Sequence, residues 1–104
     1  MLGFEKEKEN IMELKFEWDE EKAAINLKKH KISFEDAVYV FQDDNRIEFF
    51  DAEHSDFEDR YVAIGMVGTV LYVVFTERRD IIRIISARKA NSLERSYYYD
   101  NISN

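Results

Sequence analysis

The sequence predicts a single α+β domain, with helices packed on one face of a mostly antiparallel sheet. Its apolar residues recur in the order expected for a strand, two helices, four strands and a last helix. The four later strands follow one another too closely for parallel crossovers, which need about a dozen residues or more. A chain of 104 residues, 45% of them apolar, can bury one core without disulfides.

The chain starts with a charged segment, Met1–Ile11, that has no apolar period. We expect this segment to be an N-terminal extension, either a loose tail or a short solvated helix, before a single domain at 12–104. The first strand is predicted at Met12–Trp18, where apolar and charged residues alternate strictly. One face of this strand carries Met12, Leu14, Phe16 and Trp18, and the other carries Glu13, Lys15 and Glu17.

Two helices are predicted after this strand. Asp19 is the expected N-cap of a helix that ends near His30, where lysines suit the negative end of the helix dipole. Ser33 begins the second helix, with Asp36 in a near capping box. The residues expected to face the sheet are Ala23, Ala24 and Leu27 in the first helix and Ala37, Val38 and Phe41 in the second.

The second half of the chain is predicted to form a meander of strands and a final helix. Gly68-Thr69 and Arg78–Asp80 are expected turns, and the acidic loop Asp51–Asp59, which contains His54, is expected to be solvated. Asn91 and Glu94 form the capping box of the last helix. The strands are predicted at Arg46–Phe50, Arg60–Val67, Val70–Thr76 and Ile81–Ala87, and the residues expected to dock the last helix are Leu93, Tyr97 and Tyr98.

Composition narrows the function classes. The chain has no cysteine and two histidines, so cysteine-ligated zinc is excluded, and we expect neither a metal nor a cofactor. No apolar stretch is long enough to span a membrane and no signal peptide is visible, so we expect a cytoplasmic protein.

The net charge of −7 is unevenly distributed along the chain. Residues 1–59 carry 18 acidic and 8 basic residues, whereas residues 60–104 carry 4 acidic and 7 basic residues. This asymmetry indicates a local basic surface on an acidic body, or simple scatter of surface charge.

The segment from Thr76 to Lys89 holds the residues best suited to phosphate chemistry. Glu77 and Arg78 end one strand, and Arg83 and Arg88 lie in and after the next. Metal-free RNA cleavage needs a base for the 2′-hydroxyl and positive charge at the phosphorus, roles that fit Glu77 and the arginines. The structural alternative is a cross-strand Glu77–Arg83 ion pair that completes the sheet.

Four further residues are candidates for RNA binding, each with a structural alternative. Trp18 either stacks on a base or lies in the core. Lys28 and Lys29 either guide a phosphate backbone or only end a helix, and Lys89 extends the basic segment next to Arg88. Both histidines are expected at the surface, and one of the rings of Tyr97, Tyr98 and Tyr99 is expected to be exposed.

The pattern of these residues resembles the BrnT family of toxins across about Phe16–Tyr99. The first half of the match contains Phe16-Glu17-Trp18-Asp19-Glu20-Glu21-Lys22, then Asn26-Leu27 with Lys29-His30, then Ser33-Phe34-Glu35-Asp36-Ala37. The second half contains Arg60-Tyr61 with Ile64-Gly65, then Thr76-Glu77-Arg78, then Arg83-Ile84-Ile85-Ser86-Ala87-Arg88-Lys89-Ala90, then Glu94-Arg95.

The resemblance implies a RelE-like α+β fold and a ribonuclease toxin of a type II toxin–antitoxin system that arrests translation. It also implies a BrnA-type antitoxin with a ribbon-helix-helix DNA-binding part, through which the complex contacts operator DNA. Carried onto this chain, the Thr-Glu-Arg and Arg-Ile-Ile-Ser-Ala-Arg elements make Glu77, Arg78, Arg83 and Arg88 the expected catalytic residues. Relatives often have glycine where this chain has Arg79, so we expect either a less tight turn or a positive φ at Arg79.

Two hypotheses of different classes follow. The first is a metal-independent ribonuclease toxin that acts through Glu77 and the arginines. The second is a non-catalytic binding module, or an inactive toxin relic, because one fold can serve several functions. The binding-module hypothesis is favoured if the arginines form closed ion pairs instead of converging on one exposed face.

Overall fold

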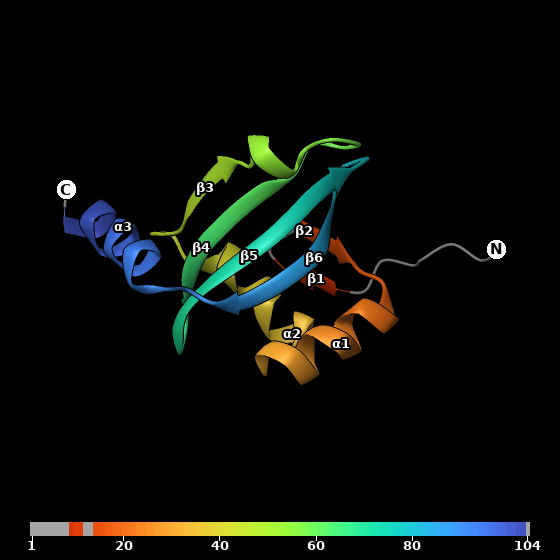
Figure 1. Cartoon of the computed structure of the whole chain (residues 1–104), viewed down its shortest axis with the longest axis horizontal. Coiled ribbons are helices and arrows are strands. Elements are labelled where there is room, and N and C mark those ends of the chain that lie inside the picture. The colour runs from red at the N-terminus through yellow and green to blue at the C-terminus, as the bar shows by residue number, and fades with distance from the viewer. Residues whose placement is uncertain (1–8, 12–13, 104) are drawn as a thin grey trace.

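The computed structural model describes residues 9–11 and 14–103, which form one six-stranded sheet with helices on both of its faces (Figure 1). The spatial order of the strands is β1-β2-β6-β5-β4-β3. Their bounds are Glu9–Ile11 for β1, Leu14–Glu17 for β2, Ile47–Phe50 for β3, Tyr61–Val67 for β4, Thr69–Arg78 for β5 and Ile81–Lys89 for β6. Only β2 and β6 pair in parallel, so the predicted, mostly antiparallel α+β sheet is confirmed.

The start of the sheet differs from the prediction. Glu9–Ile11 was expected in a loose tail or a short helix, but it forms β1 and pairs antiparallel with β2, with Ile11 opposite Leu14. Three residues are too few to show a strand period in the sequence, and their pairing covers an edge of β2 that would otherwise be open. The rest of the expected extension, at 1–8, and the predicted strand residues Met12 and Glu13 lie outside the described residues.

The helical segments are α1 (Glu20–His30), α2 (Phe34–Ala37) with the 3₁₀ turn η1 (Val38–Gln42), the 3₁₀ turn η2 (Ala52–His54) and α3 (Ser92–Ser103). The three α-helices begin at the caps that the sequence predicts. Asp19 and Ser33 each accept a backbone N–H bond of 3.0 Å at the start of α1 and α2. Asn91 and Glu94 exchange the two hydrogen bonds of a capping box at α3. None of these helices is long and apolar enough to cross a membrane in the part of the chain that the structure describes.

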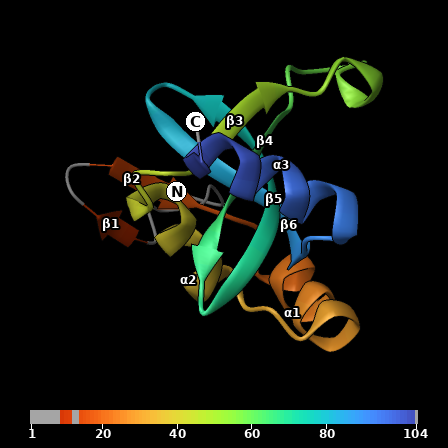
Figure 2. The same ribbon diagram turned by 90° about the vertical axis from the view of Figure 1, so that its left-hand side faces the viewer.

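The two faces of the sheet carry separate cores. The inner face, which α1, α2 and η1 cover, holds the larger core, with Phe16, Trp18, Phe34, Phe41, Phe75 and Ile84 among its buried residues. The outer face carries a smaller cluster of Val62, Ile64, Val70, Ala90 and Tyr98, which belongs to α3. Figure 2 shows α3 apart from α1 and α2. The expectation that all helices share one face is therefore wrong for α3, because its single buried tyrosine reaches the outer cluster.

Helix α1 buries a polar residue where apolar ones were expected. Ala24 and Leu27, two of the three residues predicted to face the sheet, are exposed, and Asn26 is buried instead. The Asn26 side chain donates to Ala87 O at 2.9 Å and accepts from Ala87 N at 3.1 Å. Its amide thus pairs with the β6 backbone beyond the point where β2 ends, at Glu17 opposite Arg83. Hydrogen bonding, which an apolar pattern does not reveal, decides the orientation of α1.

Helix α3 is anchored by one tyrosine. Leu93 and Tyr97 were expected to dock it, but both are exposed, whereas Tyr98 is buried and donates a 2.5 Å hydrogen bond to Asp43 Oδ2. Asp43 also accepts from the backbone N–H of Met66 at 2.8 Å. Asp43 therefore ties the segment after η1 to both β4 and α3.

Candidate functional site

The pairing register places two of the candidate arginines on the outer face of the sheet. Arg83 lies opposite Thr76, and Arg88 lies opposite Tyr72. Ile82 and Ile84, on either side of Arg83, point into the inner core, as strand alternation requires. Because α1 and α2 cover only the inner face, the surface around both arginines is left to α3 and to the 51–60 loop.

Arg83 is paired with a residue from the other end of the sequence. Its Nη1 lies 3.0 Å from Glu17 Oε2, and the two side chains are only 14% and 11% exposed. The parallel pairing of β2 with β6 sets Glu17 directly beside Arg83. The predicted cross-strand pair of Glu77 with Arg83 is wrong, because Glu77 lies opposite Ile82.

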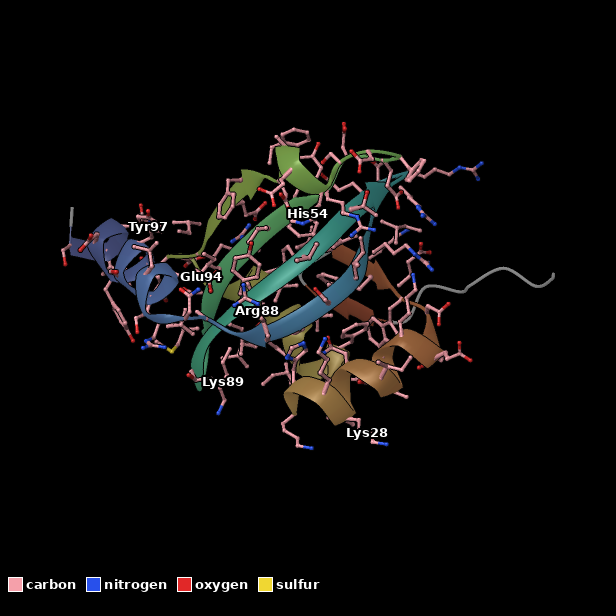
Figure 3. All side chains as sticks on the ribbon, in the orientation of Figure 1. Lys28, His54, Arg88, Lys89, Glu94 and Tyr97 are labelled. Atoms are coloured by element: carbon pink, nitrogen blue, oxygen red, sulfur yellow. The ribbon has the colours of Figure 1, made fainter. Side chains whose placement is uncertain are left out.

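Arg88 is held by a carboxylate from α3 and by an aromatic ring (Figure 3). Its Nη1 and Nη2 donate to the two carboxylate oxygens of Glu94 at 2.8 and 2.9 Å, and its guanidinium carbon lies 3.9 Å from the centre of the Tyr72 ring. The hydrogen bonds to Glu94 raise the pKa of Arg88 above its ordinary value. Burial acts to raise the pKa of Glu94, but the bonds from Arg88 and from Asn91 N–H outweigh it and lower that pKa. Arg88 is therefore a permanently charged, well-oriented group.

Arg78 and Glu77, which end β5, take up different positions. Arg78 donates through Nε and Nη2 to the carboxylate of Glu58, at 3.1 to 3.3 Å. Glu77 is exposed, shares the side of the sheet with Ile82, and makes no ion pair or side-chain hydrogen bond within the described part of the chain. The geometry thus does not bring Glu77 to Arg83 or Arg88.

The four residues predicted to bind RNA also do not gather at the arginines. Trp18 is 2% exposed and packs edge-to-face on Phe34, so it lies in the core and offers no free ring face for stacking on a base. Lys28 and Lys29 are exposed in the last turn of α1. Lys89, at the end of β6, is opposite the core residue Leu71. The three lysines therefore lie on the α1 side of the sheet, away from the outer face.

Comparison with known proteins then identifies the family. Residues 18–94 match the family model described as the ribonuclease toxin BrnT of type II toxin–antitoxin systems. The chain belongs to the BrnT family. A solved structure, the Brucella abortus ribonuclease toxin BrnT, is similar, with 25% sequence identity and a TM-score of 0.56. The match covers 72% of this chain and 94% of that one. No curated protein matches the sequence.

Family membership confirms the resemblance seen in the sequence and makes this BrnT-family chain a toxin of a type II toxin–antitoxin system. Such a toxin has a protein antitoxin as its partner. The α+β arrangement is shared with the Brucella toxin.

Sequence reasoning missed one group of polar residues, in the loop between β3 and β4. His54 was expected to be an unremarkable surface histidine, and the acidic loop around it to be merely solvated. His54 is exposed, as expected, and in addition its Nδ1 lies 3.0 Å from Asp51 Oδ2 and the residue lines a pocket with Arg60. A signal was present: the i, i+3 spacing of Asp51 and His54 across a single turn.

Proposed function

We propose that this BrnT-family toxin is a metal-independent endoribonuclease that arrests translation in the cytoplasm until an antitoxin binds it. The observation that supports this proposal is that Arg83 and Arg88 share the outer face of the sheet, which α1 and α2 do not cover. In this proposal the RNA backbone lies along the outer face, and its phosphates approach the two guanidinium groups.

The chemistry required of these residues is charge stabilisation. When a 2′-oxygen attacks the phosphorus, negative charge builds up on the phosphoryl oxygens, and fixed guanidinium groups stabilise it without reorganising. Arg88 is suited to this because Glu94 and Tyr72 hold its position, and Arg83 because Glu17 does. A phosphate oxygen can share the donors of each arginine with its carboxylate or displace that carboxylate.

A second candidate function is binding without catalysis. The observation that favours it is that Arg78, Arg83 and Arg88 each pair with a carboxylate, from Glu58, Glu17 and Glu94 respectively. Closed ion pairs neutralise the charge that a phosphate would use, and a toxin of this kind would act by occupying its target.

Cleavage of labelled RNA in EDTA by wild-type, Arg88→Gln and Glu94→Gln proteins separates these functions. Both substitutions break the same ion pair, but only Arg88→Gln removes the guanidinium. We expect about a 100-fold loss of cleavage for Arg88→Gln, the usual effect of removing one oxyanion donor, and a smaller loss for Glu94→Gln, which keeps the guanidinium but holds it less firmly.

Three outcomes contradict this expectation in different ways. Equal losses in both variants mean that the ion pair serves only the fold. Undiminished cleavage by Arg88→Gln places the site elsewhere. Growth arrest by a wild-type protein that cleaves no RNA, alone or on ribosomes, supports the binding module.

We further propose that the partner is a BrnA-type ribbon-helix-helix antitoxin that covers the segment Arg78–Arg88 with an acidic or helix-forming segment. Operator DNA would then be contacted through the antitoxin only. Arg83→Glu should abolish antitoxin binding, and Arg78→Glu, at a more exposed position, should weaken it. Titration calorimetry with folded variants checks this, and unchanged affinity in both would refute the proposed contact.

A further inference from the structure

The loop between β3 and β4 forms a pocket of about 240 Å³, lined by His54, Asp56, Phe57, Glu58 and Arg60. In Figure 3, His54 lies over the same face of the sheet as Arg88. The strand register agrees: Tyr61 is opposite the core residue Phe75, so the preceding Arg60 belongs to the outer face. The pocket thus opens beside the surface on which the arginines lie.

His54 is oriented for proton transfer. Its Nδ1 lies 3.0 Å from Asp51 Oδ2, and because an ionised carboxylate can only accept, Nδ1 carries the proton of the neutral ring. The lone pair is then on Nε2, which lies 3.7 Å from Glu53 Oε1. The imidazole is 61% exposed, whereas the Asp51 side chain that holds it is 16% exposed. This is the arrangement of a base and its orienting carboxylate.

Two other residues of the pocket offer contacts to RNA. Within 9–11 and 14–103, the Arg60 guanidinium makes no ion pair and no hydrogen bond, so its donors are available to a phosphate. The Phe57 ring is fully exposed, although it is apolar and lies in an acidic loop. An exposed aromatic ring beside a cation is a stacking platform for an unpaired base. Of the two carboxylates in the pocket, that of Glu58 is already bound by Arg78.

The loop is held in place from both ends. Asp51 N donates to Arg60 O at 2.8 Å, and Ser55 bridges the same two residues through its hydroxyl. Thr76 Oγ1 donates to Asp59 O at 2.7 Å, which ties the loop to β5. These bonds fix His54 and Arg60 relative to each other before any substrate binds.

We propose that this pocket completes the cleavage site for single-stranded RNA on the outer face, with His54 as the general base, Arg60 as a further phosphate ligand besides Arg83 and Arg88, and Phe57 as the base-stacking ring. This inference rests on the proposed ribonuclease function. His54 Nε2 takes the proton of the 2′-hydroxyl, the 2′-oxygen forms a bond to phosphorus, and the P–O5′ bond breaks. The leaving 5′-oxygen takes a proton from water, and the resulting hydroxide receives the proton held by His54. The products are a 2′,3′-cyclic phosphate and a 5′-hydroxyl, with no net change in protons.

The test compares His54→Asn with His30→Asn in the RNA cleavage assay. Asparagine can keep a donor to Asp51 but cannot accept the 2′-proton, and His30, on α1, is the matched histidine outside the pocket. We expect His54→Asn to lose about 100-fold or more in kcat with KM nearly unchanged, the usual contribution of a general base. His30→Asn should cleave like the wild type. Added imidazole should restore cleavage by His54→Gly, which a purely structural role would not allow.

Arg60→Gln and the substrate provide independent readouts. Arg60→Gln should raise KM, and a substrate with one 2′-deoxynucleotide at the cut should resist cleavage there. Undiminished kcat in His54→Asn, together with a loss in Arg88→Gln, overturns this inference while the proposed ribonuclease function stands. Absence of cleavage by the wild type, on free RNA and on ribosomes, overturns the proposed function and the inference with it.

Discussion

Arg83 shows how one residue links the function of this toxin to its stability. It interrupts an apolar strand, and its charge is compensated by Glu17, 66 positions away in the sequence. Both side chains are mostly buried, so each ion would be costly to leave alone. Arg83, which the proposed function uses to position charge for RNA, therefore also holds β2 against β6.

Removing either partner of this pair should destabilise the fold. We expect Arg83→Ala and Glu17→Ala each to lower the free energy of unfolding by roughly 3 kcal/mol, because each breaks a mostly buried ion pair. The double variant should lose clearly less than the sum of the single variants. Urea unfolding of all four proteins measures this coupling, and additive losses would show that the ion pair contributes nothing.

At the scale of elements, the turn between β5 and β6 constrains the backbone conformation of its two residues. Arg79 and Asp80 have φ of 53° and 69°, the left-handed region that favours glycine. Of the two expected alternatives, a positive φ at Arg79 is thus confirmed. Successive positive φ values match the right-handed twist of a two-residue hairpin turn, so the strain comes from the topology.

Replacing Arg79 with glycine should relieve this strain. We expect Arg79→Gly to stabilise the protein by about 0.5–1 kcal/mol, seen as a higher melting temperature. Arg79→Ala is the control, since it removes the same charged side chain but keeps the Cβ atom. Equal stability of the glycine and alanine variants would mean that backbone strain at this position has no energetic consequence.

At the scale of the whole molecule, α3 is attached through hydrogen bonds of Tyr98 and Asn101 and through the ion pair of Glu94 with Arg88. Burial, together with the bond to Asp43, raises the pKa of Tyr98 from 10.0 to about 12. Burial acts to raise the pKa of Asp43, but hydrogen bonds from Tyr98 and from the backbone N–H groups of Met66 and Asn45 outweigh it and lower the value. The Tyr98–Asp43 bond thus requires a protonated phenol and an ionised carboxyl.

The stability of the molecule should therefore fall in alkali. The phenol of Tyr98 holds its proton more tightly in the folded state, so its contribution is complete below pH 10 and is lost as the pH rises to about 12. We expect a loss of roughly 2 kcal/mol over this range in the wild type, beyond that in Tyr98→Phe. Tyr97→Phe, at an exposed neighbour, should behave like the wild type. Chemical denaturation at several pH values measures the difference, and parallel curves for wild type and Tyr98→Phe would disprove the coupling.

The sequence by itself determined the elements that depend on near neighbours. The three N-caps, the two hairpin turns and the buried side of α2 and η1 at Ala37, Val38 and Phe41 follow from local hydrogen bonding and apolar spacing. The family pattern was also readable, because its motifs are short runs of consecutive residues.

Only the tertiary structure decided which polar groups meet. Strand alternation assigns Glu77 and Arg83 to faces only once the register is known, and the register puts Ile82, not Arg83, opposite Glu77. The parallel contact between β2 and β6 brings Glu17 to Arg83, and the hydrogen bonds of Asn26 turn Ala24 and Leu27 of α1 outward. The pairs Glu17–Arg83 and Asn26–Ala87 join residues more than sixty positions apart, and the free energy that selects them comes from burial and charge compensation in the folded chain, which no local period encodes.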